Sequence, residues 1–265
     1  MKIFISADIE GITTTTSWEE CDPNHGSYPL HAKQMTEEVL AAIAGAKDAG
    51  AKEIIVKDAH GPGKNIDPTK MPADVKLIRS WRGSPYSMAE GIDSTFDAAM
   101  FVGYHSPSGR MGNPMSHTIS KSHVSYTING RSTSEFHLYS FACALNGVPT
   151  VFLSGDKMLC DDFADLHPRL ITCPVKEGWG SQTMNYSTAQ TLKDIRELAK
   201  KALNQDLKQA LVTLPKSFEA QIYFVEHKQA EKASYFPGVT KVSDNVVKFS
   251  SVDFYEILRT TNWII

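Results

Sequence analysis

The sequence lacks three features that would each point to a class of protein: a long hydrophobic run, an excess of basic charge and a cluster of cysteines. Asp8 and Glu10 interrupt the apolar N-terminal stretch, so it does not fit a secretory signal. No apolar run approaches the roughly 18 residues that span a membrane. A net charge of −3 provides no basic face for nucleic acid. We therefore expect a cytoplasmic protein that binds neither a membrane nor nucleic acid.

The four cysteines, at positions 21, 143, 160 and 173, are too scattered to form a C-x-x-C pair. This spacing argues against a structural zinc knuckle or a redox motif. In a reducing compartment such residues stay as free thiols. Cys143 has apolar neighbours on both sides and is most simply a core residue.

Short apolar segments alternate with amphipathic ones, a pattern typical of an α/β fold with a mostly parallel sheet flanked by helices. The 265 residues, 42% of them hydrophobic, suffice for a large core. Ser187 and Gln190 fit a capping box at the start of the last predicted helix of this part. The predicted strands are 2–7, 53–57, 77–78, 98–103, 123–128 and 149–154, and the predicted helices are 31–49, 134–146, 187–204 and a short one within 85–96.

The pattern changes after Pro215. Strand-like segments at 221–225 and 239–249 are each followed by a helix-like stretch, which predicts a smaller α+β lobe. We therefore divide the chain into an α/β domain, residues 1–210, and a small C-terminal lobe, residues 211–265, packed on it. The candidate metal-binding and catalytic residues all lie in the first of these.

Carboxylates and imidazoles follow four predicted buried strands: Asp8 and Glu10, then Asp58 and His60, then His105, and finally Asp156. Because ligands of open α/β sheets bind outside the carboxyl ends of the strands, one edge of this sheet should gather these side chains. Two neighbouring carboxylates repel unless a cation neutralises them, and imidazole is the commonest metal ligand. The pattern predicts a hydrolytic metal site, with Asp58 orienting His60 from behind.

Each of these residues also has a purely structural alternative, which the sequence alone leaves open. Asp8 fits a helix N-cap or a turn, and a single histidine after a strand often bonds only to backbone. Glu135, at the start of a predicted helix, would stabilise the helix dipole. His117 lies in the Gly-, Pro- and Ser-rich segment 104–122 beside the predicted site. It is a candidate acid–base or oxyanion-stabilising group.

A series of short motifs runs in order through most of the chain: Asp8-Ile9-Glu10-Gly11, Met35-Thr36-Glu37-Glu38, Asp58-Ala59-His60, Ser87-Met88-Ala89-Glu90-Gly91-Ile92-Asp93, Phe101-Val102-Gly103-Tyr104-His105, Met115-Ser116-His117, Ile128-Asn129-Gly130, Ser134-Glu135, Ser154-Gly155-Asp156, Val175-Lys176, Gln229-Ala230-Glu231 and Phe236-Pro237-Gly238. No single motif decides the matter. The ordered set resembles the D-aminopeptidase family, dinuclear zinc peptidases of bacterial peptide catabolism.

The resemblance implies two zinc ions per chain and a homo-oligomeric ring, a homodecamer, whose inner cavity limits substrates to short peptides. It makes His117 the catalytic histidine and gives Asp8 the place that bridges the ions. Four of the implied ligands also follow from the strand-end pattern, whereas Glu135 follows from the resemblance alone. The implied zinc ligands are Asp8, Glu10, His60, His105 and Glu135.

These observations predict a zinc-dependent aminopeptidase that hydrolyses short peptides from the N-terminus, with preference for N-terminal D-amino acids. A hydroxide shared by two zinc ions would attack the peptide carbonyl. The alternatives are a related metal-dependent amidase or L-aminopeptidase, because fold and ligands do not fix the substrate. A non-catalytic metal- or peptide-binding protein is a third alternative, but pure metal storage does not need His117.

Overall fold

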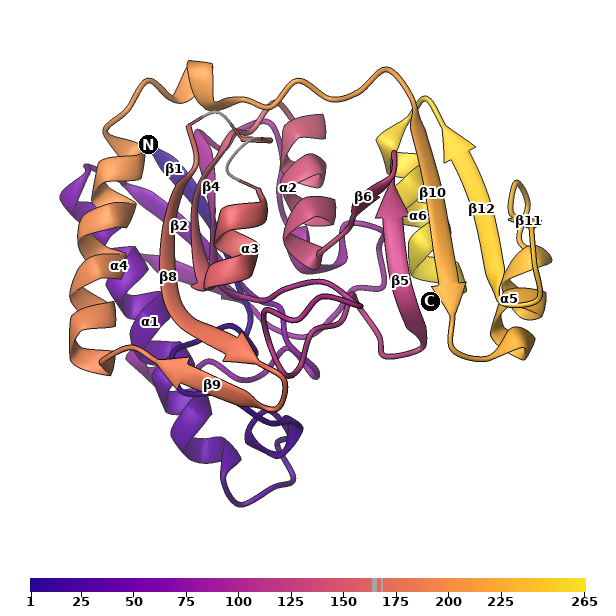
Figure 1. Ribbon diagram of the computed structural model, residues 1–265. Helices are drawn as coiled ribbons and strands as arrows, with labels where there is room; N and C mark the ends of the chain where they lie inside the picture. The colour runs from indigo at the N-terminus through magenta and orange to yellow at the C-terminus, as the bar shows by residue number, and fades with distance from the viewer. Residues whose placement is uncertain (164–165, 168) are drawn as a thin grey trace.

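The computed structural model describes residues 1–163, 166–167 and 169–265, and its centre is a seven-stranded sheet (Figure 1). Neighbouring strands pair in parallel from β3 to β8, and only β9 runs antiparallel to β8. The expected α/β fold with a mostly parallel sheet is confirmed. The strands, in the order in which they lie in the sheet, are β3 (Val75–Ile78), β2 (Glu53–Asp58), β1 (Lys2–Ala7), β4 (Ala98–Tyr104), β7 (Thr150–Asp156), β8 (Ile171–Trp179) and β9 (Gln182–Asn185).

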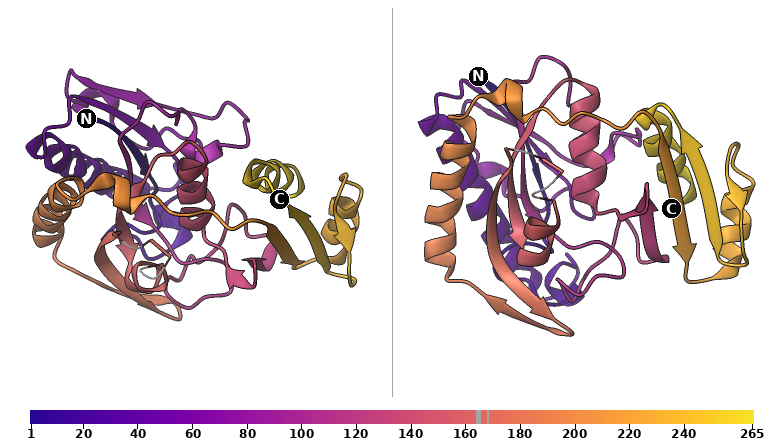
Figure 2. Two further views of the ribbon diagram at one scale, coloured as in Figure 1. Left: turned by 90° about the horizontal axis from the view of Figure 1, so that it is seen from above. Right: turned by 45° about the horizontal axis from the view of Figure 1, so that its top comes forward.

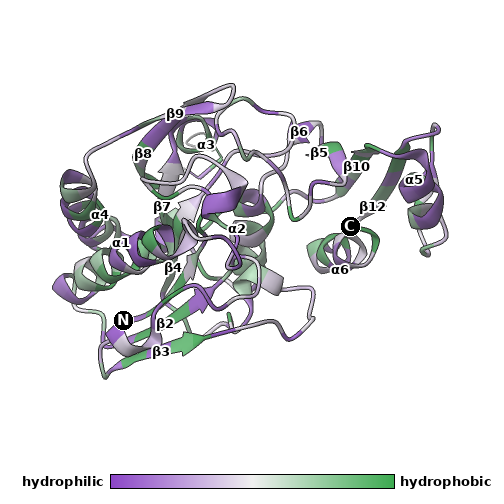
Figure 3. Ribbon diagram, turned by 90° about the horizontal axis from the view of Figure 1, so that it is seen from below, coloured by the Kyte–Doolittle hydropathy of each residue, from purple (hydrophilic) through white to green (hydrophobic). Residues whose placement is uncertain are grey.

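Helices cover both faces of this sheet (Figures 1 and 2). On one face α1 (Tyr28–Asp48) packs against α4 (Thr188–Leu203), whose hydrophobic and hydrophilic residues lie on different sides of the helix (Figure 3). Gly45 permits this contact, because a Cβ there would lie 2.3 Å from the Arg196 carbonyl oxygen. On the other face lie α2 (Glu135–Leu145) and the shorter α3 (Lys157–Asp162).

A second, antiparallel sheet lies beside α2 and draws on two distant parts of the chain (Figure 1). Its rings continue the hydrophobic core, since Phe141 of α2 lies 6.5 Å from Phe218 and 5.3 Å from Phe254, centroid to centroid. Two helices, α5 (His227–Ser234) and α6 (Phe254–Ile264), pack on this sheet. Its strands, in spatial order, are β11 (Thr240–Lys241), β12 (Val246–Ser251), β10 (Phe218–Phe224), β5 (His123–Ile128) and β6 (Arg131–Ser132).

The strands of the second sheet come from both sides of the predicted domain boundary at residue 210. Its strands β5 and β6 come from the middle of the chain, between β4 and α2, and pair with β10 from the C-terminal part. The sheet therefore does not coincide with residues 211–265. The division at residue 210 stays a prediction about folding units, which sheet membership alone does not test.

Several predicted elements differ from the structure. The short helix predicted within 85–96 is present as the 3-10 helix η3 (Ser87–Ala89), and Gly91, with a φ angle of 97°, follows it. Segment 239–249 is two strands separated by a turn, and β8, β9 and α3 were not predicted. Ser187 makes no side-chain cap hydrogen bond, so the predicted capping box is wrong. The remaining 3-10 helices are η1 (Trp18–Glu20), η2 (Pro68–Lys70) and η4 (Leu207–Ala210).

The four cysteines are buried free thiols, as expected. Cys143 is a residue of α2 and lies in the hydrophobic core, in agreement with its apolar neighbours in the sequence. Over the described part of the chain, no helix combines the length and apolarity needed to cross a membrane.

Candidate metal centre

The functional residues meet where strands β1 and β4 lie side by side. Helix α1, which follows β1 in the chain, covers one face of the sheet. Helix α2, which follows β4, covers the other face. Such a reversal opens a crevice at the carboxyl ends of the two strands, the usual ligand site of an open α/β sheet. Asp8 follows β1 at this point and His105 follows β4.

Two glycines let these strand ends approach each other closely. The Gly11 amide donates to the Gly103 carbonyl over 2.8 Å. A Cβ on Gly11 would lie 1.9 Å from the Tyr104 carbonyl oxygen, and one on Gly103, where φ is 74°, would lie 2.3 Å from the Asp8 carbonyl oxygen. Any larger residue would push the β1 and β4 ends apart and separate the side chains that follow them.

The five predicted ligands converge on one point. Nδ1 of His60 lies 3.0 Å from a Glu10 oxygen and 3.4 Å from Oδ1 of Asp8. Nε2 of His105 lies 3.4 Å from Oδ2 of Asp8 and 3.3 Å from Glu135. Asp8 thus presents one oxygen to each histidine. The ligand atoms of Asp8, Glu10 and His60, and those of Asp8, His105 and Glu135, form two compact groups that share Asp8.

Backbone carbonyls fix the tautomers of the histidines in the site. Nε2 of His60 lies 3.0 Å from the Cys21 carbonyl, Nδ1 of His105 lies 3.0 Å from the carbonyl of the next residue, and Nδ1 of His117 lies 2.9 Å from that of Met115. A carbonyl can only accept, so each of these ring nitrogens carries the proton. The other nitrogen of each ring therefore presents a lone pair to the carboxylates. Lone pairs facing carboxylates need a cation, either a metal ion or a second proton on the ring.

The electrostatics of the site show the same demand for positive charge. Burial, and then the Glu10 charge, raise the pKa of Asp8 to about 7. Burial lowers the pKa values of His60 and His105, but the facing carboxylates raise them more, to well above the ordinary value. Burial raises the pKa of Glu135, yet the charges of His105 and His117 and the His105 hydrogen bond together outweigh burial and bring this pKa to about 2. Oδ2 of Asp8 and Nε2 of His105 are buried without a hydrogen-bond partner among the described residues, as metal-ligand atoms would be.

His117 lies over the same cluster but in a different electrostatic state. Its ring stacks on that of His105, with centroids 4.4 Å apart and planes 9° from parallel. Its Nε2 lies 3.4 Å from Glu135. Burial and then the His105 charge lower the pKa of His117, so its imidazole is neutral near pH 7. A further group, Glu10 with His105 and His117, also meets the spacing of a metal site.

Glu135 owes its place to the start of α2. Ser134 is the N-cap and accepts a hydrogen bond from the His137 amide over 3.1 Å. Glu135 is therefore the first residue of α2, and its side chain points back toward the ends of β1 and β4. One Glu135 oxygen also accepts from the Ile119 amide over 2.6 Å, which ties the loop that carries His117 to the helix. The residue is more than a partner of the helix dipole, the structural alternative for it.

Asp58 does not orient the His60 ring, so that prediction is wrong. Its oxygens accept from the amides of Asn65 and Ile66, over 2.5 and 2.7 Å, and from the Asn65 side chain over 2.7 Å. The Asn65 side chain in turn donates to the His60 carbonyl over 2.7 Å. Asp58 therefore shapes the loop that carries His60, while the Cys21 carbonyl orients the ring.

Asp156, the fourth carboxylate at a strand end, also supports a neighbour. It accepts from the amide and the hydroxyl of Ser106, each over 2.6 Å, and so holds the turn that follows His105. It also caps α3 through the Leu159 amide. The strand-end pattern thus identifies the right edge of the sheet, but does not separate side chains that face the cavity from those that hold its loops.

Lys176 is a buried residue of the site to which the sequence reasoning gave no role. Its ammonium donates to the Glu10 carbonyl and to the carbonyl and hydroxyl of Thr15, the last two over 2.6 and 2.8 Å. Burial lowers the pKa of this lysine to about 8. The sequence feature that could have identified Lys176 is its position as the single lysine of segment 171–176, which is otherwise mostly apolar. Its contacts hold the turn between Asp8 and the following loop.

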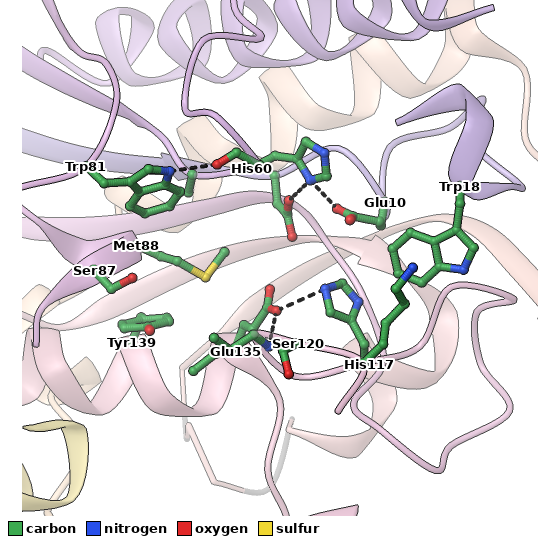
Figure 4. A pocket seen from close by; sticks show the side chains of 15 residues that line it. Glu10, Trp18, His60, Trp81, Ser87, Met88, His117, Ser120, Glu135 and Tyr139 are labelled. Atoms are coloured by element: carbon green, nitrogen blue, oxygen red, sulfur yellow. Dashed lines mark hydrogen bonds and ion pairs between the residues drawn. The ribbon is translucent and has the colours of Figure 1, made fainter. Parts of the chain in front are cut away.

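The cluster forms the floor of a cavity of about 500 Å³, the size of a small-ligand site. Figure 4 shows Trp18 and His117 on one side of the carboxylates and Trp81, Met88 and Tyr139 on the other. The cavity thus has one wall that is mainly apolar and an opposite wall that carries the candidate acid–base group. The histidines outside this region either pack in the interior (31, 123, 137 and 167) or lie on the surface (25 and 227), as the sequence indicated.

Comparison with known proteins agrees with this geometry. The model of the D-aminopeptidase family matches residues 1–263 of the sequence. This chain belongs to the D-aminopeptidase family. A curated D-aminopeptidase of Bacillus subtilis (strain 168) is 30% identical over 258 residues, which cover 97% of this chain and 93% of the relative. The solved structure of the zinc-dependent D-aminopeptidase DppA from Bacillus subtilis, a self-compartmentalizing protease, superposes with a TM-score of 0.93 at 29% identity, covering 100% of this chain and 96% of that one.

Membership of the D-aminopeptidase family confirms the resemblance found in the sequence. It also makes the chain an enzyme of the metallo-aminopeptidase class, a hydrolase of peptide bonds, as predicted. The donors in the cavity fit zinc, the metal on which the related DppA depends: zinc takes imidazole nitrogen and carboxylate oxygen, and three histidines and three carboxylates are available here.

Proposed function

We propose that this chain is a zinc-dependent aminopeptidase that removes N-terminal residues, preferably D-amino acids, from short peptides. Two zinc ions would be held by Asp8, Glu10, His60, His105 and Glu135, and His117 would be the catalytic residue. The observation that carries the proposal is the sharing of Asp8, whose two oxygens face His60 and His105 at equal distances of 3.4 Å. A carboxylate placed in this way is suited to bridge two cations.

Zinc ions at these positions would supply a nucleophile derived from water at neutral pH and would polarise the scissile carbonyl. The chain's own residues supply orientation and proton transfer. His117 keeps its proton on Nδ1, which donates to the Met115 carbonyl, and leaves Nε2 open to the cavity. That nitrogen can take up a proton and pass it to the leaving amine, or stabilise the developing oxyanion once protonated.

The two walls of the cavity suggest how a peptide would lie. The wall of Trp81, Met88 and Tyr139 suits the side chain of the N-terminal residue. His117 lies on the opposite side, where it would meet the leaving amine and the rest of the peptide. In this orientation the apolar wall would distinguish a D from an L residue at the N-terminus of the peptide.

Elemental analysis of protein purified without chelator or added metal tests the metal centre. We expect two zinc ions per chain. One ion would contradict the bridging role of Asp8, and no ion, with none taken up on dialysis, would overturn the proposal. A panel of matched D- and L-aminoacyl amides and dipeptides then separates the reactions. Faster cleavage of L substrates would replace the D preference, and cleavage of amides without dipeptides would make the enzyme an amidase.

A cytoplasmic homo-oligomeric ring, a homodecamer, forms part of the proposal. The description of the related Bacillus subtilis structure as a self-compartmentalizing protease supports it. Such a compartment would admit short peptides and exclude folded proteins. Native mass spectrometry would give ten chains per particle, whereas a monomer at micromolar concentration would contradict the ring.

A further inference from the structure

One lysine of the cavity lining has no role in the proposed reaction. Lys121 lines the cavity beside Ser120 and His117. Apart from the histidines, the other charged groups of the lining are the carboxylates Asp8, Glu10 and Glu135. Lys121 is thus the lysine or arginine that the described lining offers to an anionic group of a ligand.

The position of the Lys121 ammonium is set by aromatic contacts. Its Nζ lies 4.3 Å from the centre of the Trp18 ring, a cation–π contact. Trp18 in turn meets the His117 ring edge to face at 5.1 Å. The ammonium is therefore held two ring contacts from the candidate acid–base group, on the side where the leaving amine would lie. No carboxylate of the described residues forms an ion pair with Lys121, so its charge is available.

A neighbouring cavity favours one direction for a bound anion. Trp18, His60 and Lys121 also line a second hollow, of about 310 Å³, whose other charged lining residues are Glu19 and Asp22. Those two carboxylates repel an anion from that side. The catalytic cavity also carries carboxylates, but the proposed zinc ions would neutralise them, so an anionic group that pairs with Lys121 would lie there.

We propose that Lys121 binds the C-terminal carboxylate of the substrate and so makes the enzyme selective for peptides of two or three residues with a free C-terminus; this inference rests on the proposed function. A peptide bound with its N-terminal side chain on the apolar wall would have its chain directed past His117 toward Trp18, against whose ring Lys121 lies. Two to three extended residues span roughly 7–11 Å, which a cavity of about 500 Å³ can accommodate. A longer peptide would place its carboxylate beyond the lysine.

The test compares substrates that differ only at the C-terminus, a D-alanyl dipeptide and its carboxamide, in the wild type and in Lys121→Met. Methionine keeps an apolar stem on Trp18 but removes the charge. For the free dipeptide we expect a rise in KM and a fall in kcat/KM of roughly 10- to 100-fold, as for the loss of a hydrogen bond to a charged group, with kcat little changed. The carboxamide should lose less than threefold. Lys121→Arg should restore most of the selectivity, and Lys70→Met, which changes an exposed lysine elsewhere, should match the wild type.

Binding separates this inference from the proposed function. Calorimetry of the zinc-loaded enzyme with a dipeptide analogue whose peptide bond is reduced, and with its carboxamide, needs no turnover. The wild type should bind the free acid roughly tenfold more tightly or better, and Lys121→Met should bind both equally. Equal binding of acid and amide by the wild type, or an equal loss for both in the variant, would overturn the role of Lys121. Preferential binding of the acid without hydrolysis of any peptide would instead contradict the proposed function.

Discussion

The imidazoles of His105 and His117 stack face to face, 4.4 Å apart, yet the site drives their pKa values in opposite directions. His105 faces Asp8 and Glu135, whose charges outweigh burial and raise its pKa. His117 is desolvated and lies against the positive charge of His105, so its pKa falls. One ring of the pair is therefore suited to lie beside a cation, and the other to exchange a proton.

Replacing His117 with alanine tests this division of roles. We expect kcat to fall by roughly 10²–10⁴, the usual contribution of a positioned acid–base group, while elemental analysis still gives two zinc ions per chain. Near-complete turnover in the variant would remove the catalytic role. Loss of one ion would instead make His117 a ligand with Glu10 and His105, the other grouping that the geometry allows.

Replacing Asp8 with alanine should empty the site, because both groups of ligand atoms share this carboxylate. Metal content should drop below one ion per chain and activity should be lost. Asp58→Asn is the matched control, since Asp58 follows the neighbouring strand but bonds to the amides of Asn65 and Ile66. It should lower the melting temperature and keep both ions. An Asp8→Ala protein that retains two ions would rule out the bridging role.

Gly11→Ala should separate the ends of β1 and β4. The new Cβ would meet the Tyr104 carbonyl at 1.9 Å, and backbone cannot rotate away as a side chain can. We expect a loss of about 1–3 kcal/mol in the free energy of unfolding, measured by urea denaturation, together with reduced zinc occupancy. Gly26→Ala, where a Cβ meets nothing within 4 Å, should change neither. A stable, fully loaded Gly11→Ala protein would contradict the close approach.

His123 should make stability depend on pH. Its ring packs edge-on near Tyr126 and Phe224, and burial lowers its pKa from 6.5 to about 4. The folded state thus holds the neutral ring, whereas the unfolded chain takes up a proton below about pH 6.5. Stability contributed by this group is full above that pH and falls as the pH drops toward 4. Between pH 7.5 and 5.5 the loss should be about 1 kcal/mol.

The variant His123→Phe should remove that part of the pH dependence. Neither ring nitrogen of His123 has a hydrogen-bond partner in the described part of the chain, so phenylalanine loses no bond and buries no polar atom. Urea denaturation of both proteins at pH 7.5 and 5.5 gives the difference. An equal loss of stability in the two proteins would show that His123 does not titrate in this range.

The sequence by itself determined the class of fold and the edge of the sheet that carries the site. Apolar strands such as 2–7 and 98–103 are buried on both faces, so their length and position can be read directly, and the residues after them must lie at their carboxyl ends. The order of motifs also led to the correct family. Local patterns failed where a strand carries polar residues, as in β9.

Only the tertiary structure decided which strand-end residues face the cavity. Asp8 and Asp58 look alike in the sequence, but one faces two histidines and the other two backbone amides. Glu135 and His117 reach the site from a helix start and a long loop, and Lys176 from a strand distant in sequence. Their convergence depends on the β1–β4 contact that Gly11 and Gly103 allow, and contacts between distant segments leave no periodic signal in the chain.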